Sequence, residues 1–177
     1  MSGDAAVLTL PVTERDHATG PITAPLVLVE YGDYQCEHCA TSYAVIKALR
    51  AAFGSELTVV FRNFPLTSIH DHAQRAAEAA EWAGLAGRFW DMHDYLYEHQ
   101  HRLDDRGLLA AANALGLEPR DLQHAWDSHA TIPRVKEDFL GGIANGVTGT
   151  PKLFLNGRRY DGQVTVAELT TALQAAR

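Results

Sequence analysis

The two cysteines of this chain lie three positions apart, in the segment GDYQCEHCATSY at residues 32–43. Only Glu37 and His38 separate Cys36 from Cys39. Cysteines at this spacing can form a redox pair or half of a metal site, or they can be ordinary core residues. A structural disulfide explains them poorly, because a bridge across so short a loop stabilises little and a reducing cytosol would keep it open.

A metal site is also poorly supported. Zinc usually takes four protein ligands, and these usually come as two pairs. The chain has one CXXC pair, and its nearest histidine pairs are His70 with His72 and His99 with His101. Neither pair has the spacing that places two ligands on one helical face. We therefore predict no metal site and no organic cofactor, and the redox interpretation remains.

A redox pair makes demands on its surroundings. The first cysteine should begin a helix directly after a buried strand, where free N–H groups and the helix dipole stabilise a thiolate. Residues 25–31 (PLVLVEY) form a nearly continuous apolar run, which is typical of a buried parallel strand. Gly32 and Asp33 then predict a turn. The following residues predict a helix that ends at Gly54; its apolar face comprises Cys39, Tyr43, Ile46, Leu49 and Phe53.

The rest of the chain predicts an interrupted α/β fold. Residues 57–62 (LTVVFR) form a second buried strand, parallel to the first through a right-handed crossover. Residues 70–146 carry almost no strand signal and predict a block of helices. The last of these helices has Thr131 as its expected N-cap, and its apolar face is expected to comprise Ile132, Val135, Phe139 and Ile143.

Strand signals return after residue 146. Residues 152–155 and 158–161 predict a hairpin around Asn156-Gly157. Thr165 and Glu168 fit a capping box that begins a final helix. The element order is β-α-β, a helical block, then β-β-α, so we predict one α/β domain with a helical insertion.

Composition and charge exclude several classes of function. At 177 residues, 46% of them hydrophobic, the chain can bury one sizeable core. A net charge of −7 argues against binding to nucleic acid or to an anionic membrane surface. No apolar run approaches the roughly 18 residues of a membrane span. The N-terminus lacks a secretory signal, so we expect a cytoplasmic protein, or a periplasmic one if a signal was removed. We also expect a monomer.

The order of elements, with CXXC opening the first helix, resembles the thioredoxin fold, and the helical block resembles its DsbA-like branch. CEHC is similar to that branch's Cys-Pro-His-Cys. VTGTP at residues 147–151, followed by KLFLNG, resembles the family's cis-proline segment. VLVEYGDYQC also matches, with an acid six residues before the first cysteine. The resemblance implies an N-terminal extension at 1–20 and one domain at 21–177, with thioredoxin parts at about 21–66 and 147–177 and a helical insertion at about 67–146.

The resemblance also implies a role for each residue of the motif. Cys36 is the candidate nucleophile, whose thiolate attacks a disulfide, and Cys39 resolves the mixed disulfide. His38 can lower the pKa of Cys36 and make the protein more oxidising. Glu37 stands where the family has proline. Its carboxylate would disfavour the Cys36 thiolate and make the protein less oxidising, unless the side chain only faces solvent.

Three more residues complete the expected site. Glu30 would lie behind the sulfur atoms and take or give the proton of Cys39; the alternative is that this end of the strand emerges into water. Thr150 and Pro151 would face the two sulfurs and present a backbone edge to an extended substrate. Thr150 also offers a hydroxyl that could hydrogen-bond one thiol.

These expectations define the function predicted from sequence. We expect a thiol–disulfide oxidoreductase that acts on protein or small thiol and disulfide partners. One alternative is a glutathione-dependent transferase or isomerase of the same superfamily. Another is a redox-sensitive peptide-binding or chaperone-like module.

Overall fold

A five-stranded sheet forms the centre of the protein. The computed structural model describes residues 7–177, so residues 1–6 of the expected N-terminal extension lie outside the described residues. In sheet order the strands are β1 (His17–Thr19), β3 (Leu57–Asn63), β2 (Leu26–Gly32), β4 (Lys152–Leu155) and β5 (Arg158–Tyr160). β2 and β3 are parallel, as predicted, whereas β1, β4 and β5 each pair antiparallel with their neighbours.

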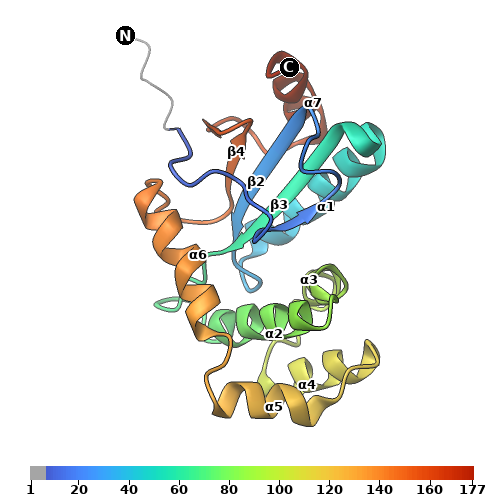
Figure 1. Ribbon diagram of the computed structural model, residues 1–177, viewed down its shortest axis with the longest axis vertical. Helices are drawn as coiled ribbons and strands as arrows, with labels where there is room; N and C mark the ends of the chain where they lie inside the picture. Colours follow the sequence, from blue (N-terminus) through green and yellow to red (C-terminus); the bar gives the residue numbers. More distant parts are fainter. Residues whose placement is uncertain (1–6) are drawn as a thin grey trace.

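Seven helices are described, and their order confirms the predicted fold class. α1 (Glu37–Phe53) connects β2 to β3 through a short 3₁₀ turn at Gly54–Glu56. The inserted helices are α2 (Ala73–Leu85), α3 (Phe89–Glu98), α4 (Asp105–Ala114), α5 (Pro119–Asp127) and α6 (Ile132–Ala144), and α7 (Val166–Ala175) closes the chain. Figure 1 shows α2 to α5 gathered beyond one end of the sheet, with α6 running from them back toward it.

The side chains of β2 point alternately to the two faces of the sheet, and the hydrophobic core is divided between these faces. Leu26 and Leu28 pack in one cluster with α1 and α7. Val29 and Tyr31 belong to a second cluster, on the face against which α6 packs. Because side chains two residues apart share a face, Glu30 lies on the same face as Leu28 and therefore toward α1.

A third hydrophobic cluster fills the helical insertion and extends to the start of α1. Six alanines line the buried face of α2 and leave room for the neighbouring helices. The cluster also includes Phe61 of β3 and both cysteines. The insertion therefore packs directly against the segment that holds the CXXC motif.

Two expectations for α6 are wrong. Thr131 precedes the helix but does not cap it, because its hydroxyl donates to the carbonyl oxygen of Glu78 in α2 at 3.3 Å. Ile143 is 53% exposed rather than part of the core. The last turn of α6 approaches Tyr31 and Phe64 through Gly142, so Ile143 lies on the solvent side of that turn.

The hairpin turn between β4 and β5 holds both ends of the described chain. Asn156 and Gly157 have positive φ angles of 44° and 79°, as the predicted turn requires. The Leu8 amide donates to the carbonyl of Gly157 at 2.7 Å, and the Asn156 side-chain amide donates to the carbonyl of Ala176 at 2.8 Å. Both ends therefore lie at the far end of β4 from Pro151.

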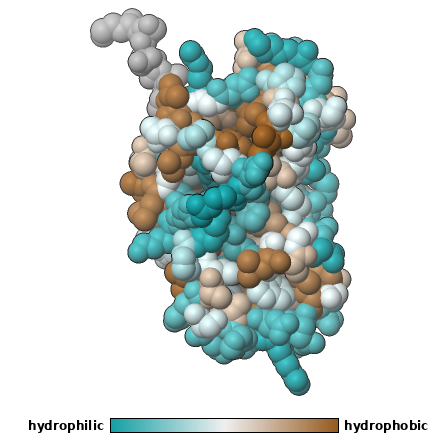
Figure 2. All heavy atoms as spheres, viewed as in Figure 1, coloured by the Kyte–Doolittle hydropathy of each residue, from teal (hydrophilic) through white to brown (hydrophobic). Residues whose placement is uncertain are grey.

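Within residues 7–177, none of the helices combines the length and the apolar character needed to cross a membrane. Figure 2 shows hydrophilic residues spread over both the sheet and the helical parts of the visible face, with hydrophobic residues in separate patches.

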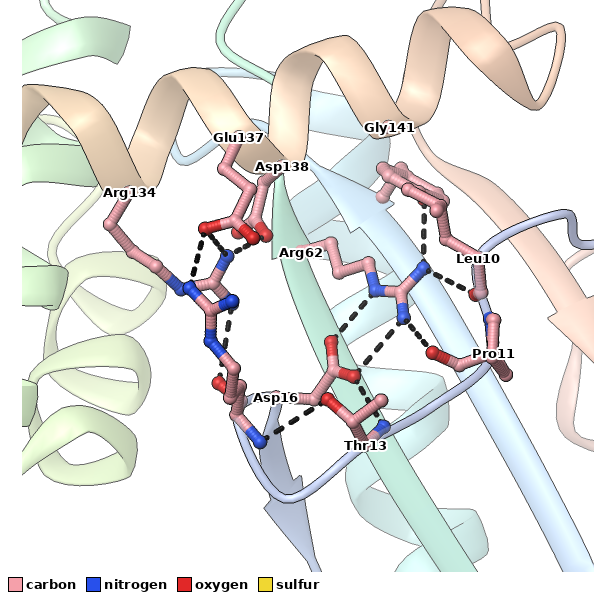
Figure 3. A pocket seen from close by; sticks show the side chains of 11 residues that line it. Leu10, Pro11, Thr13, Asp16, Arg62, Arg134, Glu137, Asp138 and Gly141 are labelled. Carbon is pink, nitrogen blue, oxygen red and sulfur yellow. Dashed lines mark hydrogen bonds and ion pairs between the residues drawn. The ribbon is translucent and has the colours of Figure 1, made fainter.

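A buried ion pair fastens the N-terminal segment to β3. Arg62 donates to both carboxylate oxygens of Asp16 at 2.8 and 3.1 Å, and the side chains of this pair are only 6% and 7% exposed. Arg62 also donates to the carbonyls of Leu10 and Pro11. Figure 3 shows these bonds converging on one guanidinium group in a pocket between the N-terminal segment and α6.

Loss of Asp16 should destabilise the protein strongly. Asp16→Ala leaves the buried Arg62 charge without its carboxylate, so we expect the free energy of unfolding to fall by about 3–5 kcal/mol. Urea unfolding at neutral pH measures the change. The control is Arg15→Ala, which removes an exposed pair with Glu137 and should change the same quantity by less than about 1 kcal/mol. Equal losses in the two variants would contradict this account of Arg62.

Candidate redox site

Cys36 lies at the N-cap of α1, in the extended conformation that precedes a helix. Its amide donates to the carbonyl of Asp33 at 3.2 Å, which closes the turn after β2. Its thiol donates to the carbonyl of Thr150 at 3.5 Å. Both cysteines are free thiols. Cys36 is 6% exposed, whereas Cys39, one turn into the helix, is fully buried.

The two thiols have opposite acidities. A hydrogen bond from the Cys39 thiol lowers the pKa of Cys36 to about 5; burial opposes this, and the backbone N–H groups of Cys39 and His38 and the side chain of Thr150 support it. Burial raises the pKa of Cys39 far above its usual range, and the neighbouring Cys36 and Glu30 add to that effect. At neutral pH the pair therefore consists of one thiolate near the surface and one protonated thiol behind it.

Glu30 lies behind the sulfurs in β2, with 2% of its surface exposed. Burial raises the pKa of Glu30 to about 8; the nearby Ser42 hydroxyl opposes the shift, and negative charge at Cys36 increases it. Among the described residues, no donor makes a hydrogen bond to its Oε1 atom. The strand therefore does not emerge into water at this residue, and Glu30 holds a proton near neutral pH.

The segment before β4 faces Cys36 from the other side. The Thr150–Pro151 peptide bond is cis, and the Thr150 carbonyl accepts the Cys36 thiol. The Thr150 hydroxyl is buried and has no hydrogen-bond partner in residues 7–177. A thiolate at Cys36 or Cys39 could accept from this hydroxyl, which agrees with the lowering effect of Thr150 on the pKa of both cysteines.

Glu37 and His38 occupy the first turn of α1, and both side chains are exposed. His38 contributes to the thiolate through its backbone N–H. Such a contribution is available to any residue except proline at this position. The effects predicted for the His38 imidazole and the Glu37 carboxylate stay predictions.

Three polar side chains, those of Asp33, His70 and Gln100, hold the CXXC loop through bonds that were not predicted from the sequence. The buried carboxylate of Asp33 accepts from the amides of Gln35 and Leu66 and bonds with the His70 ring, at 2.7–2.8 Å. Gln100, in the turn after α3, donates to the carbonyls of Tyr34 and Cys36 at 2.8 Å each. The turn at Asp33 was predicted from its place after a strand, but the bonds of its carboxylate to Leu66 and His70 were not. Gln100 has no sequence signal, because it reaches the loop only through the tertiary fold.

Ser42 was also missed, although helical spacing could have indicated it. It lies three residues after Cys39 on α1, is fully buried and has an unpaired hydroxyl within the described chain. Residues three apart share a helical face. The sequence therefore places Ser42 on the same side of α1 as Cys39, toward Glu30.

The acidity of Cys36 can be measured directly. Titration of the reduced protein, followed by the ultraviolet absorbance of the thiolate, should show a transition near pH 5. Cys39→Ala removes the largest cause of the low pKa, so the midpoint should rise by about one pH unit or more. Cys36→Ser should remove the transition and identify its source. A wild-type midpoint near the ordinary cysteine value of about 8.5 would contradict the geometry.

Glu30 should make stability depend on pH. Its folded-state pKa is raised, so its contribution is fully present below the unfolded value of about 4.5 and is lost as pH rises through about 8. Between these values, the free energy of unfolding of the reduced protein should fall relative to that of Glu30→Gln by roughly 1.4 kcal/mol per pH unit. Urea unfolding at several pH values measures this. Glu37→Gln is the exposed control, and a flat difference for Glu30→Gln would show that Glu30 is not buried as described.

Curated relatives match almost the whole chain but are much longer. The Na(+)/H(+) antiporter NhaA 1 of Salinispora arenicola is 41% identical over 171 residues, which cover 96% of this chain and 26% of that protein. The Na(+)/H(+) antiporter NhaA of Herminiimonas arsenicoxydans is 39% identical over 172 residues, with 97% and 27% covered. The chain therefore spans about a quarter of the length of the curated relatives it matches.

Solved structures share the fold along nearly its full length. BdbD from Bacillus subtilis, in its oxidised form, aligns with a TM-score of 0.85 at 21% identity and covers 98% of both chains. The thiol-disulfide exchange protein alpha-DsbA2 from Wolbachia pipientis aligns with a TM-score of 0.78 at 20% identity, covering 90% of this chain and 86% of that one. At these identities the likeness establishes the fold.

The family profile described as Thioredoxin matches residues 12–175. That range includes the CXXC motif, the helical insertion and the segment around Pro151. The alignment with BdbD covers 98% of this chain, so it extends over the inserted helices as well as the sheet. The chain therefore belongs to the thioredoxin family and has the fold of its DsbA-like thiol–disulfide oxidoreductases.

Proposed function

We propose that the protein exchanges disulfides with polypeptide substrates through Cys36 and Cys39. The observation that carries this proposal is the placement of two free thiols: Cys36 lies at the N-cap of α1 against the Thr150 carbonyl, and Cys39 is fully buried one turn behind it. The Cys36 thiolate is the nucleophile, since only the deprotonated form attacks a disulfide. The buried Cys39 stays protonated until the second step.

The exchange consists of two successive displacements at sulfur. The Cys36 thiolate attacks one sulfur of the substrate disulfide, a mixed disulfide forms, and the other substrate sulfur leaves as a thiolate. Cys39 then loses its proton and attacks the Cys36 sulfur, which forms the Cys36–Cys39 disulfide and releases the second substrate thiolate. The substrate gains two electrons, the protein loses two, and the reverse sequence donates a disulfide.

Glu30 supports the second step as a proton acceptor. Formation of the mixed disulfide removes the negative charge at Cys36 that helps to raise the pKa of Glu30, so Glu30 can release its own proton to solvent and then take the proton of Cys39. A cavity of about 10 Å³, room for about one water molecule, lies against Glu30 and is also lined by Lys47 and Asp94. These two residues lie toward the surface and give the proton a short way to solvent.

The low pKa of Cys36 bears on the direction of exchange. A stabilised thiolate favours the reduced form of the protein, which makes it a better donor of disulfides. Thr150 and Pro151 support substrate binding, because the segment before β4 contacts the Cys36 sulfur directly. An extended substrate lying along this segment would bring its disulfide to that sulfur.

A trapping experiment tests the proposal. Cys39→Ser should accumulate a covalent mixed disulfide with a disulfide-containing protein such as insulin, since the resolving thiol is gone. Non-reducing electrophoresis and intact mass measure the adduct. Cys36→Ser should form no adduct and should lose at least about 10³-fold of the exchange rate. If Cys36→Ser retained peptide binding and the wild type showed no exchange, the chaperone-like alternative would replace the proposal.

A further inference from the structure

A polar groove of about 590 Å³ lies next to the redox site on the helical insertion. This volume is within the range of ligand-binding pockets. The groove is lined by Gln35, His72, Gln100, His101, Arg102, Leu103, Asp104, Arg106 and Gly107. Nothing in the exchange chemistry uses these charged residues.

Two of the lining residues are bonded to the loop that carries the nucleophile. Gln35 directly precedes Cys36, and its side-chain carbonyl accepts from the amide of His72 at 2.7 Å. Gln100 donates to the carbonyl of Cys36 at 2.8 Å. The groove therefore borders the backbone of the loop that presents the Cys36 sulfur.

The arginines of the groove are held on a rigid turn. The Arg102 amide donates to the carbonyl of His99 at 2.8 Å, and Asp104 caps α4 by accepting from the Gly107 amide at 2.9 Å. A Cβ atom at Gly107 would lie 1.9 Å from the carbonyl oxygen of Arg102. This close contact fixes the backbone of Arg102 against the first turn of α4, which also carries Arg106.

Both arginines have free charges. Their side chains are exposed, and within residues 7–177 neither forms an ion pair with an acidic side chain. Asp104 is the acidic residue of the lining, and one of its carboxylate oxygens is occupied by the cap of α4. Asp71 and Asp105 adjoin lining residues in sequence but do not line the groove. The groove is thus a site of unpaired positive charge on a chain of net charge −7.

We propose that this groove binds the carboxylates of an acidic polypeptide segment that flanks the substrate disulfide. Arginine binds carboxylates through two parallel N–H donors, which gives orientation as well as attraction. Two such residues on a rigid turn would align the segment and increase the rate of encounter. This inference rests on the proposed exchange function and adds a substrate preference to it.

The test compares two cyclic model peptides that contain one disulfide each. One carries aspartates beside the disulfide, and the other carries lysines at the same positions. We expect the wild type to reduce the acidic peptide faster than the basic one, and added salt to diminish the difference. Arg102→Glu combined with Arg106→Glu should lower the rate for the acidic peptide by about tenfold and raise the rate for the basic one.

A matched control separates the groove from overall charge. Arg120→Glu combined with Arg158→Glu changes the net charge by the same amount at two exposed positions outside the groove. These substitutions should leave the ratio of the two peptide rates within about twofold of the wild-type ratio. An equal change of the ratio in both double variants would overturn the proposal.

An uncharged disulfide distinguishes the failure of this inference from failure of the proposed function. The wild type and both double variants should react equally with 2,2′-dithiodipyridine, which needs only the Cys36 thiolate. If they do so and the two peptides react at the same rate with the wild type, exchange stands and the groove inference is wrong. The groove inference would also be wrong if the wild type preferred oxidised glutathione, lost that preference in Arg102→Glu combined with Arg106→Glu, and reacted with the two peptides at the same rate.

Discussion

The different surroundings of two sulfur atoms, one helical turn apart, are the constraint on which the rest of the structure depends. Cys36 must meet free N–H groups at the start of α1, and Cys39 must be removed from water. The strand before α1 delivers the first thiol to the surface, and the hydrophobic cluster of the insertion covers the second. Glu30 completes the arrangement from the sheet, because the alternation of β2 directs it toward α1.

The helical insertion therefore contributes directly to the structure of the redox site. It contributes hydrophobic side chains that bury Cys39 and hydrogen-bond donors that fix the loop before Cys36. Asp33 and Gln35 bind backbone groups at Leu66 and His72, where the chain leaves β3 and enters the insertion. A change in how the insertion packs would thus alter the position of the nucleophile as well as the stability of the domain.

The sequence was sufficient for the fold because its signals are local. The apolar run of β2, the spacing along α1 and the Asn156-Gly157 turn each specify an element without help from distant residues. It was insufficient where a side chain has two possible partners: Thr131 bonds across to α2 instead of capping α6. Gln100 and the Arg62–Asp16 pair depend on contacts between segments far apart in the chain. The edge strand β1 is only three residues long, and too short for a periodic signal. The expected boundaries at residues 20, 66 and 146 stay predictions.

The hydrogen bonds that join Leu8 and Ala176 to the Asn156–Gly157 turn bear on how such a domain can be combined with others. Both ends of the described chain meet at one turn, and the length of β4 separates that turn from Thr150 and Pro151. The two ends of the described chain therefore lie close together and apart from the sulfur atoms. Chain ends that lie close together and away from the reactive centre are the arrangement in which tethering, domain insertion and circular permutation generally succeed.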